Sequence, residues 1–66
     1  MRLTVNGKEQ EFDAVQTAAD LLGTLDVLRE RVAVMVNETV IRRAELETTK
    51  LHEGDTIEII TMVGGG

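Results

Sequence analysis

Ile57-Glu58-Ile59-Ile60-Thr61-Met62-Val63 runs directly into Gly64-Gly65-Gly66. The first seven residues are mostly β-branched or aliphatic and contain no turn former, which predicts a final β-strand. Three glycines after a strand fixed in a sheet predict a thin, flexible tail on a domain of residues 1–63. Fully extended, the last four residues would reach roughly 13 Å. The group that such a tail presents is the α-carboxylate of Gly66.

A glycine-rich chain end has a simpler interpretation, because many chain ends are unstructured or left over from cloning. Such an end usually follows a completed domain and a polar linker. Here the glycines adjoin the strand directly. The arrangement therefore favours a working tail.

Composition excludes several classes of function. Sixty-six residues make one small domain with a thin core and little room for an enclosed active site. The absence of cysteine removes disulfides, thiolate metal sites and thiol nucleophiles. A formal charge of −5 with one aromatic residue disfavours a nucleic-acid binder. Because no stretch reads as a signal peptide or a membrane span, we expect a cytoplasmic protein that binds neither nucleic acid nor membrane.

The first twelve residues predict a β-hairpin. Leu3 and Val5 alternate with polar residues, Asn6-Gly7 interrupts, and an extended, mostly polar pattern resumes over residues 8–12. Asn-Gly is the strongest short hairpin signal, since a type I′ turn needs positive φ at both central residues. The second strand has few apolar positions, so we expect it at a sheet edge, where its glutamates discourage edge-to-edge pairing.

One amphipathic helix is predicted next. Thr17 is the expected N-cap, and Asp20 completes a capping box beside the positive end of the helix. Apolar residues at three- and four-residue spacing then give the helix one apolar face. These residues are Ala18, Leu21, Leu22, Leu25 and Leu28.

The second half of the chain is mostly extended. Residues 32–36 predict a central strand, residues 37–38 a turn and residues 39–41 a short edge strand. Residues 44–47 predict a helical turn, and the turn at residues 52–55 begins the last strand. The order predicts an α+β domain in two layers, with a mixed sheet of four to five strands packed against one main helix. A β-grasp arrangement, with the first and last strands parallel neighbours in mid-sheet, is the most economical.

Five segments together resemble a known family. They are residues 3–8, 34–38, 41–43, 51–59 and 63–66. The family is the sulfur carrier proteins of thiamine biosynthesis, and the resemblance covers the whole chain. Its most specific part is the run Glu53-Gly54-Asp55-Thr56-Ile57-Glu58-Ile59 followed after three residues by Val63-Gly64-Gly65-Gly66.

The resemblance implies a ubiquitin-like β-grasp fold and a sulfur-carrying C-terminus formed by Gly64, Gly65 and Gly66. It implies that an E1-like adenylyltransferase uses ATP and Mg²⁺ to activate Gly66, which then becomes a 1-thioglycine thiocarboxylate. A sulfur donor such as a cysteine desulfurase supplies the sulfur, and thiazole synthase receives it. The chain would then be a carrier and cosubstrate, not an enzyme, with no bound cofactor and no metal.

The last strand also predicts a docking patch. Successive strand residues point to opposite faces, so if Ile57 and Ile59 face the helix, the alternate residues face outward. Each outward residue alone is as well explained by ordinary core or surface packing. Beside the tail they favour a partner surface, for which methionine is adaptable. The predicted partner-binding residues are Met35, Glu58, Ile60 and Met62.

Three alternatives stay open. The first alternative is a sulfur carrier for another pathway, such as the small subunit of molybdopterin synthase or a carrier for amino-acid or tRNA thiolation. The second is a ubiquitin-like modifier joined to lysines through the same terminus. The third is a passive β-grasp interaction module. His52, Arg42 and Arg43 are expected to be solvated loop residues.

Overall fold

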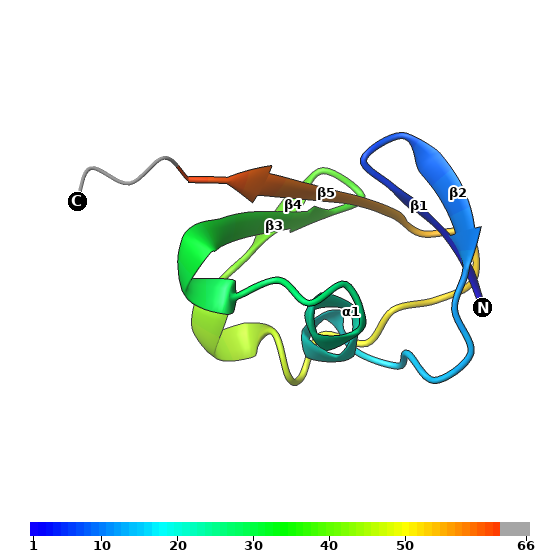
Figure 1. The fold of residues 1–66 in the computed structure, drawn as a ribbon, viewed down its shortest axis with the longest axis horizontal. Coiled ribbons are helices and arrows are strands. Elements are labelled where there is room, and N and C mark those ends of the chain that lie inside the picture. The colour runs from blue at the N-terminus through cyan, green and yellow to red at the C-terminus, as the bar shows by residue number, and fades with distance from the viewer. Residues whose placement is uncertain (63–66) are drawn as a thin grey trace.

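The computed structural model describes residues 1–62, which form a five-stranded sheet with one α-helix against one of its faces (Figure 1). The strand order is β2-β1-β5-β3-β4. This confirms the predicted α+β β-grasp fold. Val63 and the predicted tail, Gly64 to Gly66, lie outside the described residues. The elements are β1 (Arg2–Val5), β2 (Lys8–Glu11), α1 (Ala18–Thr24), β3 (Val32–Val36), β4 (Thr39–Ile41) and β5 (Thr56–Thr61), with single 3₁₀ turns η1 (Arg29–Arg31) and η2 (Arg43–Glu45).

β5 is the centre of the sheet. It runs parallel to β1, with Val5 opposite Ile57, and antiparallel to β3, with Val32 opposite Thr61. Because Ile57 has a strand on either side and α1 below, it is only 1% exposed. The strand ends at Thr61, before Met62, which the prediction includes; residue 63, the predicted end, lies outside the described residues. In Figure 1, β5 ends at the end of the molecule opposite the N-terminus.

Two asparagine turns hold β5 from opposite sides. Asn6, at φ 51° before Gly7, accepts a hydrogen bond from the Ile59 amide at 2.8 Å through Oδ1. Asn37, at φ 49°, accepts one from the Thr56 amide at 3.0 Å. Asparagine tolerates this left-handed conformation at the first turn position, and the second position is Gly7 in one hairpin and Glu38, at φ 72°, in the other. The predicted turns at these positions are confirmed.

The capping box of α1 is present as predicted. Thr17 Oγ1 accepts from the Asp20 amide, and the Asp20 carboxylate accepts from the amide of Thr17, both at 3.1 Å. The carboxylate also accepts from the Gln16 amide at 3.0 Å. These bonds from Gln16 and Thr17 lower the pKa of Asp20 below its ordinary value of 3.8.

The predicted helix length is wrong: α1 ends at Thr24, and Leu28 is 62% exposed. Asp26 takes φ 60°. Its amide donates to the Gly23 carbonyl, and the Val27 amide donates to the Leu22 carbonyl. This pair of bonds is a Schellman motif, in which an aspartate occupies the left-handed position that is usually glycine. The chain thus turns after two helical turns, and Val27 packs against the core in place of Leu28.

The segment that follows β4 packs against the start of α1. The Ala18 and Ala19 amides donate to the carbonyls of Thr49 and Leu46, each at 3.0 Å. Leu46 and Leu51 are buried, although the sequence around them has no period. The predicted helical turn at residues 44–47 is present one residue earlier, as η2. The buried core comprises Leu3, Val5, Phe12, Val15, Ala18, Leu21, Leu22, Val32, Val34, Leu46, Leu51 and Ile57.

We expect Asp20→Asn to lower the urea midpoint at neutral pH and to have no effect well below pH 3.8. A carboxyl group whose pKa is lowered by folding stabilises the fold above its unfolded-state pKa, and this contribution is lost as the pH falls through the lower folded-state value. Urea titrations at several pH values measure the difference. Asp13→Asn, an exposed change outside α1, is the control. A loss for Asp20→Asn that persists unchanged in acid would contradict the charge-dependent cap.

Candidate docking face

The two faces of β5 divide its side chains as expected. Ile57 is buried and Ile59 is half-buried against the core. Glu58 is exposed, and Ile60 is 49% exposed although it is a large apolar residue. Since successive residues alternate, Glu58 and Ile60 lie on the face of the sheet that α1 does not cover.

The register gathers other apolar residues on this open face. Met35 on β3 lies opposite Glu58 on β5, and Val40 on β4 lies opposite Met35. Paired residues in a sheet point to the same face. Val40 is 64% exposed. The outer patch therefore consists of Met35, Val40 and Ile60, with Glu58 beside it.

Val40 was missed by the sequence reasoning. In a strand of only three residues, the sequence alone does not show which face of the sheet the valine side chain points to. That face depends on which residue of β3 the valine pairs with. The Asn37-Glu38 turn, with φ 49° and 72°, sets that pairing. Recognising a type I′ turn there would have placed Val40 opposite Met35.

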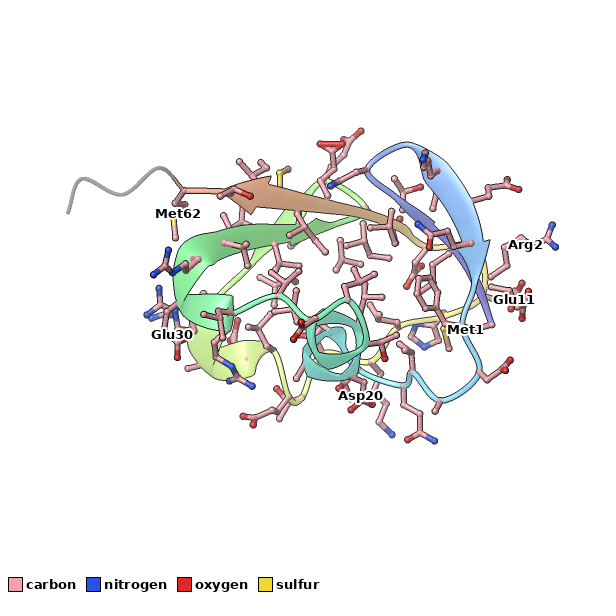
Figure 2. The ribbon with its side chains drawn as sticks, viewed as in Figure 1. Met1, Arg2, Glu11, Asp20, Glu30 and Met62 are labelled. Atoms are coloured by element: carbon pink, nitrogen blue, oxygen red, sulfur yellow. The ribbon has the colours of Figure 1, made fainter. Side chains whose placement is uncertain are left out.

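Met62 lies past the end of β5. Its amide donates to the Arg31 carbonyl at 2.8 Å, and the residue is 45% exposed. Figure 2 shows Met62 at the same end of the molecule as Glu30, and away from Met1, Arg2 and Glu11. It therefore stands beside η1, directly before residues 63–66 in the sequence. Of the four predicted docking residues, Met35, Glu58 and Ile60 come together on the open face, and Met62 lies at the sheet's end.

A shallow hollow on the open face carries negative charge. It is lined by Met35, Asn37, Glu38, Thr56 and Glu58. Neither Glu38 nor Glu58 forms an ion pair within residues 1–62. On the far edge, by contrast, Arg2 lies 3.8 Å from both Glu9 and Glu11. The uncompensated charge beside the outer patch complements a basic partner surface.

The remaining polar candidates have structural explanations. His52 is 79% exposed, with Nδ1 3.9 Å from the Asp55 carboxylate. That carboxylate accepts from the His52 amide at 2.8 Å and so stabilises the turn before β5. Arg42 and Arg43 are exposed, as expected. Within residues 1–62, no group of acidic, histidine or cysteine side chains is arranged to hold a metal ion. None of the described helices is long and apolar enough to cross a membrane.

Comparison with known proteins shows which protein family the sequence matches. The model of the ThiS family matches residues 3–66. The crystal structure of the thiamine biosynthesis protein ThiS from Geobacter metallireducens has a TM-score of 0.84 at 36% identity and covers 100% of both chains. The thiazole synthase of Paramagnetospirillum magneticum is 36% identical over 66 residues, although the chain spans only 20% of that protein's length. Uncharacterized protein ycf40 of Porphyra purpurea is 33% identical, with 97% of this chain and 90% of ycf40 covered.

Proposed function

The chain belongs to the ThiS family, and from this we propose that it is a sulfur carrier whose terminal carboxylate, on Gly66, becomes a thiocarboxylate. The observation that carries the proposal is that the family match continues through residue 66, in direct sequence with the central strand β5. The folded domain positions the terminus, and other proteins supply the catalytic groups. The chain is therefore a cosubstrate and not an enzyme.

Activation of the carboxylate comes first, because a carboxylate is a poor electrophile. A carboxylate oxygen of Gly66 attacks the α-phosphorus of ATP, and the bond to the β-phosphate breaks to release pyrophosphate. The product is an acyl-adenylate with AMP as its leaving group. An E1-like adenylyltransferase with bound Mg²⁺ catalyses this step, since the described residues offer no phosphate-binding loop and no metal ligand set.

Sulfur then replaces the activated oxygen. The sulfur donor, such as a cysteine desulfurase, carries a persulfide. The terminal sulfur of this persulfide attacks the carboxyl carbon of Gly66 and expels AMP. The resulting acyl disulfide is cleaved by a second thiol, which forms a disulfide with the donor and leaves the thiocarboxylate on Gly66. We propose thiazole synthase, in the cytoplasm, as the acceptor, because curated relatives that contain a matching segment carry that name.

Glycine is suited to a terminus that enters two active sites. A narrow channel that brings the carboxyl carbon beside an α-phosphate leaves no space for a β-carbon. Fixing each residue in such a channel costs about 1–2 kcal/mol of backbone entropy. The domain must therefore supply binding energy elsewhere. We propose that the outer patch and Met62 supply it by docking on the adenylyltransferase, because β5 carries Ile60 and leads directly to the reacting terminus.

We expect Ile60→Asp to weaken binding to the adenylyltransferase by about 2 kcal/mol, or roughly 30-fold, because a charge would be buried in an apolar contact. Ile60 is half exposed in the free chain, so the melting temperature should hardly change. Titration calorimetry and thermal melts measure the two effects. Ala14→Asp, which adds the same charge on an exposed loop, is the control. Equal affinities for the two variants would exclude the outer patch as the docking site.

One reconstitution tests the proposed function. The chain is incubated with the adenylyltransferase, ATP, Mg²⁺ and a persulfide donor, and its intact mass is then measured. We expect a gain equal to the difference between sulfur and oxygen, localised to Gly66 by fragmentation. An unchanged mass would reject the sulfur carrier. Stable conjugates with lysines of other proteins would instead indicate a modifier.

A further inference from the structure

The β1 side of β5 is left open beyond Ile57. The parallel ladder between the two strands contains the pairs Thr4 with Thr56 and Val5 with Ile57, and β1 then ends. The antiparallel ladder with β3 continues four residues further, to Thr61. The end of a central strand therefore has a neighbour on one side only.

Backbone groups of β5 point alternately to its two neighbours. The Met62 amide donates to the carbonyl of Arg31, the residue directly before β3, and the Ile57 carbonyl accepts from the Asn6 amide on the β1 side. Odd-numbered residues thus direct N–H and C=O away from β3. At Ile59 the Asn6 side chain bonds both groups. Its Oδ1 accepts from the Ile59 amide at 2.8 Å, and its Nδ2 donates to the Ile59 carbonyl at 3.3 Å. On the β1 side of Thr61 no strand of residues 1–62 is paired with it, so its N–H and C=O form an open strand edge there.

A groove of about 380 Å³ follows this edge on the helix side of the sheet. Apolar side chains of Leu25, Val27 and Ile59 are half-buried there, so part of their surface is still exposed. Lys8 lines the other wall and forms no ion pair within the described residues. The full lining is Val5, Asn6, Lys8, Gln10, Leu25, Val27, Val32, Ile59 and Thr61.

We propose that this edge receives an extended segment of the adenylyltransferase, which pairs with Thr61 as an added β-strand. The inference rests on the proposed function and concerns a surface separate from the outer patch. Strand addition supplies main-chain hydrogen bonds for affinity and side-chain pockets for specificity. The groove fits a segment with one apolar side chain toward Val27 and one carboxylate toward Lys8.

The adenylyltransferase is the favoured occupant because of position. Thr61 precedes the reacting terminus by five residues, so the enzyme that holds Gly66 must also approach this end of β5. An enzyme strand beside Thr61 would therefore be bound close to the point where the chain leads into its reacting terminus. A second copy of the chain also has a free strand edge to offer, and the experiment separates these two cases.

The test uses Thr61→Pro and Thr61→Ala. Proline removes the amide proton of residue 61, which makes no bond to β3, so the fold should persist. Alanine keeps the proton and removes the side chain. We expect Thr61→Pro to bind the adenylyltransferase about two- to tenfold more weakly than Thr61→Ala. Lys8→Glu should cost about two- to fivefold, whereas Lys50→Glu, the matched change outside the groove, should cost nothing.

Amide exchange measured by NMR adds a direct readout. In the complex of the native chain, exchange at Thr61 should slow at least about tenfold, with a smaller change at Ile59, which is already bonded. Equal binding of the two Thr61 variants with unchanged exchange at Thr61 would overturn the inference. If the native chain is still adenylated in that case, the proposed function stands; if it is not, both fall. Protection of Thr61 without enzyme, accompanied by dimerisation, would assign the edge to a second copy and overturn the inference.

Discussion

Deletion of Gly66 is expected to abolish thiocarboxylate formation completely and to leave the domain folded. The buried core ends at Ile57 and β5 at Thr61, so no described core contact involves the last residue. Without Gly66 the chain still ends in a carboxylate, but one residue, or about 3.3 Å, short of the adenylation site. Positioning errors of this size remove most of the advantage of a bound geometry. Intact-mass analysis after reconstitution measures the product.

Gly66→Ala refines this experiment. It restores the chain length and adds only a methyl group, so we expect product to be absent for a steric reason. Thermal melts of both variants should match the native chain. Normal thiocarboxylate on the deletion variant would show that the reacting atom is elsewhere and would remove the basis of the proposed function.

Ile57→Ala is expected to lower the free energy of unfolding by about 2–5 kcal/mol. Ile57 lies in the central strand, pairs with both β1 and β3, and is 1% exposed. A domain of this length has a total stability of only about 3–10 kcal/mol. The substitution therefore removes a large part of it. Urea unfolding followed by circular dichroism measures the change.

Ile60→Ala is the matched control, because it makes the same truncation on the same strand three residues further on. Ile60 is 49% exposed and faces away from α1. We expect a loss of less than about 1 kcal/mol in stability, accompanied by weaker binding of the adenylyltransferase. Similar destabilisation by both variants would mean that β5 does not separate a core face from a docking face.

The parts of the fold that sequence predicted correctly depend on local chemistry. Asn6-Gly7 specifies its turn through backbone conformation alone, and Thr17 with Asp20 specifies a helix start through bonds within four residues. Alternation along β5 separated Ile57 from Ile60 without knowledge of any neighbour. The same alternation put Glu58 on the open face with Ile60, whereas Met62, which was also expected to face outward, lies past the end of β5.

The parts that sequence did not predict depend on tertiary contacts. α1 ends where Asp26 turns the chain toward β3, and its apolar spacing continues past that point. Leu46 is buried because its segment packs against the first turn of α1. The apolar residues of that segment follow no helical or strand period that would predict this contact. Val40 and the open edge at Thr61 follow from strand register and from the short length of β1. These features require the assembled sheet.

The central place of β5 between β1 and β3, with Asn6 and Asn37 on either side, also determines how the domain bears load. A pull on the chain beyond Met62 acts along the strand axis, so hydrogen bonds on both sides are strained in shear and share the force. An edge strand such as β2 would transmit the same pull to one neighbour only. Forced unfolding is limited by the unfolding rate. In the proposed function, an enzyme that draws the terminus into its active site would therefore pull on the strand that the fold holds from both sides.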